Sequence, residues 1–124
     1  IRERNFSNLL KFFQKYTEYF ILPSQSDLVK TQWLAFPLTL TKNAPFTRFE
    51  IVSFLEENNI QTRPIFTGDI TKQPGFKDIS YRSIDKSFLV TQSIMERGFL
   101  IGCHHGLDQT HLDKIRIVFD YFLS

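Results

Sequence analysis

The stretch TRFEIVSFLEENNIQTRPIF, residues 47–66, carries the signals that decide the fold. Thr47 and Glu50 have the spacing of a capping box, in which a hydroxyl accepts from a first-turn N–H and a carboxylate reaches back to the cap. The apolar residues that follow cover one side of a helix, and two consecutive asparagines end the pattern before a strand-like run. The stretch therefore predicts a helix at 48–58 and a strand at 61–66.

Outward from this unit, hydrophobic spacing predicts the same alternation of helices and strands. Pro37 cannot donate to a sheet ladder and indicates an edge position or a local irregularity, and Gly98 suits a left-handed residue after a helix. The order favours one domain, residues 1–124, with the fold class of an α/β or α+β sandwich in which a small sheet has helices packed on one face. The further helices are expected near 3–19, 86–97 and 110–123, and the further strands near 33–40 and 98–102.

The composition argues against two functional classes, nucleic-acid-binding proteins and membrane-spanning proteins. The net charge of +2 is spread in mixed-sign runs, so there is no basic patch that would predict nucleic-acid binding. No apolar run is long enough to cross a membrane, and Cys103, the one cysteine, excludes an internal disulfide. These features are typical of a cytoplasmic protein. Phe12, Tyr16 and Tyr19 form a second aromatic stripe, which either widens the core or contacts a partner.

The loop that follows the predicted strand at 61–66 has features of a binding site. Because Pro64 forces an extended backbone on Arg63, the guanidinium has a fixed direction, which suits phosphate or carboxylate; the alternative is a surface ion pair. In Thr67-Gly68-Asp69 the glycine lets backbone approach a ligand, although an ordinary Asx turn explains the run equally well. Loops as long as 67–84 are usually functional or disordered.

The histidines and the cysteine give weaker signals. Adjacent residues of an extended chain point to opposite faces, so His104 and His105 are not expected to share a metal, and His111 is expected on the next helix. We therefore predict no metal site. A histidine that forms hydrogen bonds at the edge of a cleft, or a structural histidine, remains open. Cys103 is expected to be a buried thiol rather than a nucleophile.

Three segments taken together resemble the C-terminal part of the DegT group of pyridoxal-phosphate (PLP)-dependent enzymes of fold type I, the sugar-nucleotide aminotransferases and dehydratases. They are WLAFPLTL at 33–40, the run from 44 to 76, and RGFLIGCHHGL at 97–107. The resemblance is strongest to the subgroup that removes the C3 hydroxyl from 4-keto-6-deoxy sugar nucleotides. Asp69 and Cys103 depart from the subgroup, which usually has Asn at both positions.

This resemblance implies the fold of the C-terminal small domain of such an enzyme, cut from a longer chain. PLP or pyridoxamine phosphate would be held by a separate N-terminal domain, so no catalytic residue is expected here, and the isolated chain is expected to bind no cofactor and to be inactive. A sugar nucleotide and a second subunit would be the further partners. The alternative is a non-catalytic protein-binding module. The candidate substrate-binding residues are Arg63, Thr67, Gly68, Asp69, His104 and His105.

Overall fold

The capping box at Thr47 is present in the computed structural model, which describes residues 1–84 and 87–124. The Thr47 hydroxyl accepts from Glu50 N at 3.2 Å, and the Glu50 carboxylate accepts from Thr47 N at 2.6 Å. Helix α2 (Arg48–Glu57) begins there and is followed by strand β3 (Thr62–Pro64). The helix-to-strand unit predicted from this stretch is therefore confirmed, with a shorter strand.

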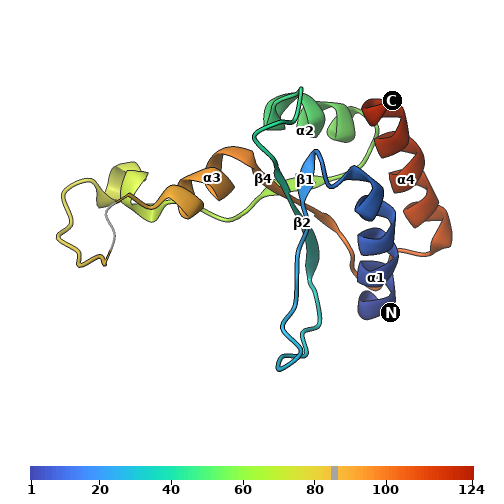
Figure 1. Cartoon of the computed structure of the whole chain (residues 1–124), viewed down its shortest axis with the longest axis horizontal. Helices are drawn as coiled ribbons and strands as arrows, with labels where there is room; N and C mark the ends of the chain where they lie inside the picture. Colours follow the sequence, from blue (N-terminus) through green and yellow to red (C-terminus); the bar gives the residue numbers. More distant parts are fainter. Residues whose placement is uncertain (85–86) are drawn as a thin grey trace.

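The sheet has four antiparallel strands in the order β1-β2-β4-β3 (Figure 1). Strands β2 (Ala35–Leu40) and β4 (Gly98–Gly102) form its centre, in the register that pairs Leu38 with Phe99. Both were expected. Strand β1 (Phe20–Ile21) was not, because two residues are too few to show the alternation of a strand.

Pro37 lies where one side of β2 has no partner. Strand β1 pairs only with Thr39 and Leu40, so β2 has a free edge beside Pro37. A proline is tolerated at such an edge because no ladder bond is lost.

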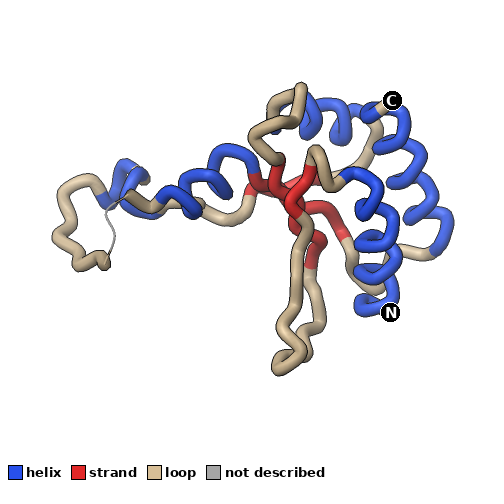
Figure 2. Tube along the Cα trace, in the orientation of Figure 1, coloured by secondary structure: helices blue, strands red, loops and turns tan. Residues whose placement is uncertain are grey.

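Helices α1 (Arg2–Phe13), α2 and α4 (Gln109–Leu123) enclose the core against one face of the sheet (Figures 1 and 2). In β2 the residues that face them are buried, and the alternate residues are only partly covered. A small sheet with helices on one face is therefore the observed architecture. The largest fully buried side chains are Phe13, Phe20, Phe36, Phe99, Phe119, Leu9, Leu38, Leu40, Ile51, Leu55, Ile101 and Leu112.

Helix α3 (Leu89–Arg97) differs from the expectation that all helices cover the sheet. It projects away from the core, none of its residues is buried, and Leu89 and Val90 are 70% and 74% exposed (Figure 1). The reason is that α3 ends at Arg97 and β4 begins at the next residue, so no connecting residues allow the helix to turn back. Its expected start at residue 86 lies outside the described residues.

Gly98 is needed for a different reason from the one predicted. Its backbone is extended, with φ −91° and ψ 142°, so the expected left-handed conformation is wrong. A Cβ at this position would lie 2.6 Å from the carbonyl oxygen of Ile94 and 2.7 Å from Cδ1 of Ile65. Close packing where α3 meets β4 therefore requires a glycine.

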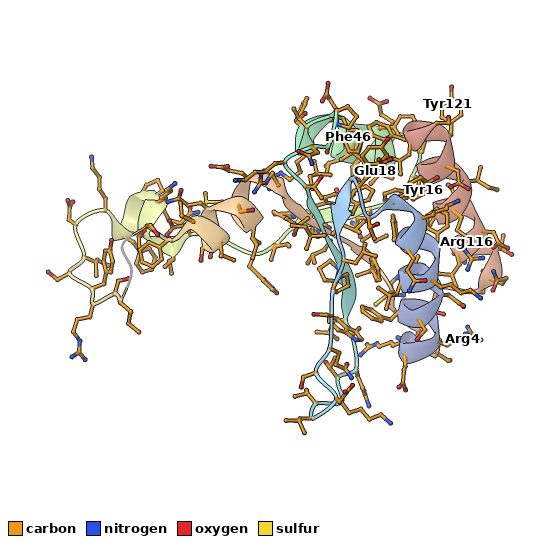
Figure 3. All side chains as sticks on the ribbon, viewed as in Figure 1. Arg4, Tyr16, Glu18, Phe46, Arg116 and Tyr121 are labelled. Atoms are coloured by element: carbon orange, nitrogen blue, oxygen red, sulfur yellow. The ribbon has the colours of Figure 1, made fainter. Side chains whose placement is uncertain are left out.

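The second aromatic stripe widens the core. Phe12, Tyr16 and Tyr19 are all partly buried and pack against core residues. Tyr16, in the 3₁₀ turn after α1, donates from its hydroxyl to Asp120 of α4 at 2.5 Å (Figure 3). These rings are therefore not the free contact surface that the alternative reading proposed.

Two segments project from the sheet (Figure 2). Exposed apolar side chains gather on them. One is the β1–β2 connection, residues 22–34, and the other comprises residues 65–84 and 87–97. They carry Leu28, Val29 and Leu34 on the first projection, and Phe66, Ile70, Phe76, Ile79, Tyr81, Ile84, Leu89 and Val90 on the second.

We predict that Gly98→Ala lowers the free energy of unfolding by about 1–3 kcal/mol, the usual cost of overpacking, because the added methyl group meets a backbone carbonyl. Gly75→Ala is the matched control, since a Cβ there has no neighbour within 4 Å. Denaturant unfolding of both variants measures the difference. Equal midpoints for the two variants would contradict the packing argument.

Candidate functional site

The turn after β3 forms one wall of a groove of about 360 Å³, and α3 contributes to the other. Gly68 has φ +63°, and a Cβ there would lie 2.5 Å from Cγ of Met95, so only glycine fits between the turn and the helix. Gly68 was expected to let the backbone approach a ligand. In the structure the backbone at Gly68 instead approaches helix α3. The groove is lined by Arg48, Pro64, Ile65, Phe66, Thr67, Gly68, Gln73 and Met95.

Phe66 is a feature of this groove that the sequence did not indicate. Its backbone has φ +47°, which is unfavourable for a bulky residue and costs on the order of 1–3 kcal/mol. Its side chain is nevertheless 86% exposed, so no burial of the ring offsets that cost within the chain. A strained backbone that presents an exposed aromatic ring is typical of a binding site.

Arg63 is held beside the groove by the start of β3. Thr62 donates from both its backbone N and its hydroxyl to Glu56 at 2.6 Å, and these bonds lower the pKa of the Glu56 carboxyl. Arg63 itself is exposed and donates from Nη1 to the Thr62 carbonyl at 2.8 Å. It lines a second hollow, of about 270 Å³, which shares Arg48 and Pro64 with the groove.

No ion pair within 4 Å among the described residues includes Arg63, although its charge contributes, after the Thr62 hydrogen bonds, to the lowered pKa of Glu56. Arg48 is the second guanidinium of this region. Its Nη1 donates to the carbonyl oxygens of Met95 at 2.8 Å and Gly98 at 3.3 Å. Arg48 therefore ties α2 to the end of α3, where a cation is favourable because the last carbonyls of a helix carry negative partial charge.

Asp69 shapes the turn rather than lining the groove. It is 3% exposed, and its Oδ1 accepts from Thr71 N at 3.0 Å and from the Thr71 hydroxyl at 2.6 Å. This is the Asx-type turn that was the alternative reading. Its Oδ2 is buried and accepts no hydrogen bond within the described residues.

The six predicted site residues do not come together. Pro64, the neighbour of Arg63, pairs with Phe99 in the sheet. His104 follows Phe99 by five residues, which at the rise of a strand places it roughly 16 Å from this pair. His104 borders a hollow near the start of α4, whereas His105 borders another with Arg2 and Gln32. Arg63, Thr67 and Gly68 are therefore neighbours, whereas the two histidines, whose ring centroids lie 6.3 Å apart, border two other hollows.

Asn5 positions the loop that carries His104. In the sequence this role is indicated only by a polar residue on the apolar side of the first helix. The Asn5 side chain is fully buried, and its Nδ2 donates to the carbonyl oxygens of His104 at 2.9 Å and Leu107 at 3.0 Å. One buried amide thus fastens the β4–α4 loop to α1.

Cys103 is the buried thiol that was predicted. It has no exposed surface, and its Sγ lies 3.5 Å from the carbonyl oxygen of Trp33. Burial raises the pKa of the thiol to about 11. At neutral pH the group is therefore protonated, and it is a poor nucleophile.

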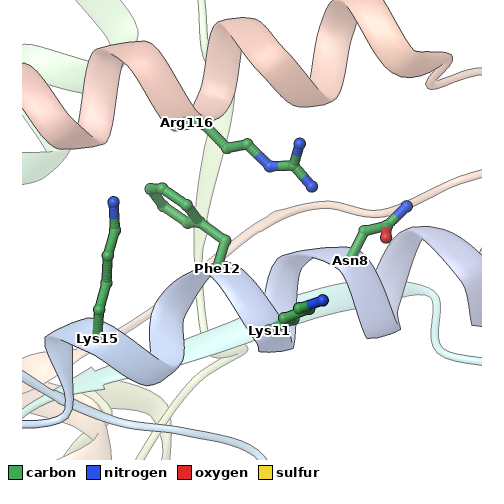
Figure 4. A pocket seen from close by; sticks show the side chains of 5 residues that line it. All are labelled: Asn8, Lys11, Phe12, Lys15 and Arg116. Carbon is green, nitrogen blue, oxygen red and sulfur yellow. The ribbon is translucent and has the colours of Figure 1, made fainter.

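A further groove runs between α1 and α4, where Arg116 reaches toward Asn8 and Phe12 (Figure 4). Two of its cations are already paired, Lys15 with Asp120 at 2.8 Å and Arg116 with Asp113 at 3.0 Å.

Within residues 1–84 and 87–124 no group of three or more metal-ligating side chains occurs. None of the described helices is long and apolar enough to span a bilayer.

The chain belongs to the DegT/DnrJ/EryC1/StrS aminotransferase family, whose sequence pattern matches residues 1–119. It is 36% identical over 123 residues to the lipopolysaccharide biosynthesis protein RfbH of Salmonella typhimurium, covering 99% of this chain and 28% of that protein. It is 33% identical over 95 residues to the dTDP-4-dehydro-2,6-dideoxy-D-glucose 3-dehydratase of Saccharopolyspora spinosa, covering 77% of this chain and 20% of that enzyme. The chain thus spans less than a third of the length of these relatives.

Solved structures share the fold. The E. coli GDP-4-keto-6-deoxy-D-mannose-3-dehydratase with bound hydrated PLP superposes with a TM-score of 0.83 at 20% identity, over 95% of this chain and 30% of that one. An aminotransferase from Psychrobacter cryohalolentis superposes with a TM-score of 0.85 at 14% identity, over 98% of this chain and 33% of that one. The predicted fold and family are therefore both confirmed.

We predict that Cys103 reacts slowly with the thiol reagent DTNB. With a pKa of about 11, roughly one thiol in a thousand is ionised at pH 8, so labelling should be about a hundredfold or more slower than for an exposed cysteine. Absorbance at constant pH follows the reaction. Labelling after unfolding in guanidinium is the control and should be fast; equally fast labelling of the folded chain would refute the buried thiol.

Proposed function

We propose that the chain is the C-terminal domain of a PLP-dependent enzyme that acts on 4-keto-6-deoxy sugar nucleotides, in the cytoplasm, as part of deoxysugar or lipopolysaccharide biosynthesis. Removal of the C3 hydroxyl is the favoured reaction, ahead of amino transfer. The observation that carries the proposal is the 36% identity to RfbH across 99% of the chain. Two further relatives are named as sugar-nucleotide 3-dehydratases, which favours dehydration.

The lysines of this chain support the proposal that the cofactor is bound outside it. When bound, PLP or pyridoxamine phosphate supplies an electron sink for the substrate. A lysine that holds such a cofactor needs an enclosed site, in which its pKa can be lowered. Every lysine of the described residues is exposed: Lys11, Lys15, Lys30, Lys42, Lys72, Lys77 and Lys114.

Arg63, Thr67 and Gly68 are assigned to the substrate. The exposed Arg63 guanidinium binds a phosphate or another polar group of the sugar nucleotide through paired hydrogen bonds. The backbone at Gly68 and the Thr67 hydroxyl supply further polar contacts in the adjoining groove. Phe66 covers the ligand with its ring and excludes water. Asp69 acts indirectly by holding the turn.

The two projections are assigned to contacts with the rest of the enzyme, including a second subunit. They carry most of the exposed large apolar side chains, and such surface is usually covered in an assembly. Ile84 and Leu28, which is 95% exposed, are the clearest cases.

The test is to express the complete reading frame that encodes these residues and to assay it with PLP and a 4-keto-6-deoxy sugar nucleotide. A protein with the absorption of bound cofactor and a C3-deoxygenated product supports the proposal, and an amino sugar product would favour transfer instead. The 124-residue chain alone should cause no shift in the PLP spectrum. A complete protein with neither cofactor nor turnover would refute the enzyme and favour a protein-binding module.

In the complete enzyme, Arg63→Ala should lower kcat/KM by roughly 10- to 150-fold, which corresponds to about 1.5–3 kcal/mol for a hydrogen bond to a charged group. Stability should change by less than about 1 kcal/mol, because the side chain is exposed and has no ion pair among the described residues. Steady-state kinetics and a thermal melt on the same protein give both quantities.

Arg63→Lys is the matched variant for this prediction. It keeps the charge but not the planar fork of donors, so it should recover only part of the lost activity. Normal turnover in Arg63→Ala would contradict the assignment of Arg63 to the substrate.

A further inference from the structure

The end of β4 borders a hollow of about 210 Å³ that the proposed substrate groove does not include. It lies where the turn between α2 and β3 approaches the first turns of α4. Three of its residues carry basic nitrogen groups, His104, His111 and Lys114. The complete lining is Asn59, Ile60, Gln61, Gly102, His104, Leu107, His111, Lys114 and Ile115.

The His104 ring is held in one orientation. Gly106 N donates to its Nδ1 at 3.2 Å, so in the neutral ring the proton is on Nε2, which is free to donate. A Cβ at Gly102 would lie 3.4 Å from this ring, and one at Gly106 would lie 3.2 Å from it. The ring therefore fits closely against two glycines, and Asn5 fixes its backbone.

His111 and Lys114 bring further donors to the same hollow from α4. His111 Nδ1 lies 2.7 Å from Asp108 Oδ1, which also accepts from His111 N at 3.1 Å. This carboxylate orients the ring and leaves Nε2 available to face the hollow. Lys114, three residues after His111 on the helix, takes part in no ion pair of the described residues.

The floor of the hollow is apolar. Ile60 and Ile115 are 6% and 5% exposed, and Leu107 packs against the same core. The mouth is polar, because Asn59 and Gln61 supply side-chain amides beside the basic groups. Two imidazoles alone do not form a metal site, and no set of three ligands exists in the described part of the chain. Several donors above an apolar floor suit an oxyanion that carries a small organic group.

We propose that this hollow is a second binding site, which takes a phosphate group, free or as a monoester, through His104, His111 and Lys114. The ester's organic part rests on the isoleucine and leucine floor. The site shares no lining residue with the groove at Gly68. It does not depend on the proposed enzyme activity, because residues of this chain form it.

The test titrates the 15N-labelled 124-residue chain with inorganic phosphate and with phenyl phosphate at constant ionic strength and pH, and follows the imidazole resonances. Those of His104 and His111 should shift and saturate. His105 borders a different hollow, and only a smaller shift is expected there, because its ring centroid lies 6.3 Å from that of His104. Tighter binding of phenyl phosphate identifies an ester as the ligand class, and tighter binding of inorganic phosphate identifies the free ion. Shifts that fail to saturate with either probe would overturn the proposal.

Lys114→Gln should weaken the binding of the better probe by about tenfold, the effect of removing a hydrogen bond from a charged group. Lys42→Gln removes the same charge from an exposed lysine outside the hollow and is the matched control. If both variants weaken binding equally, the attraction is only the net charge of the chain and the site does not exist. Both lysines are exposed, so neither replacement affects the core.

Discussion

The packing of Phe13 is the interaction on which the arrangement of this domain depends. The side chain is fully buried and meets Phe20 of β1, Phe36 of β2 and Phe119 of α4, with ring centroids 5.6, 5.4 and 4.8 Å apart. Edge-to-face and offset contacts of this kind add about 0.5–1.5 kcal/mol each to the burial of the rings. One side chain therefore joins four elements and holds α1 and α4 on the same face of the sheet.

Two polar side chains hold the backbone at the two ends of β4. Arg48 donates to the carbonyl of Gly98, where the strand begins, and Asn5 donates to that of His104, beyond its end. Each reaches from a helix whose position is set by the core, so the loops at both ends are held by the same packing. An unpaired buried donor is costly, which makes these contacts specific as well as stabilising.

The outcome is a scaffold with two separate polar regions. The groove at Gly68 is rich in backbone and guanidinium groups and lies at the base of a projection with exposed apolar side chains. The hollow at His104 has a floor of buried core residues beneath exposed polar side chains and lies at the other end of β4. The first presents the uncovered Phe66 ring, whereas the second presents imidazole, amide and ammonium groups.

The sequence by itself determined the elements whose signals lie within a few residues. These include the capping box at Thr47, the stripes of α1 and α4, the centre of the sheet and the buried thiol of Cys103. Only the tertiary structure decided that α3 projects, that Gly98 serves packing, and that His104 and His111 border the same hollow. The Asn5 to His104 bond joins residues 99 positions apart, and such contacts follow from strand register and helix packing, which no local pattern encodes.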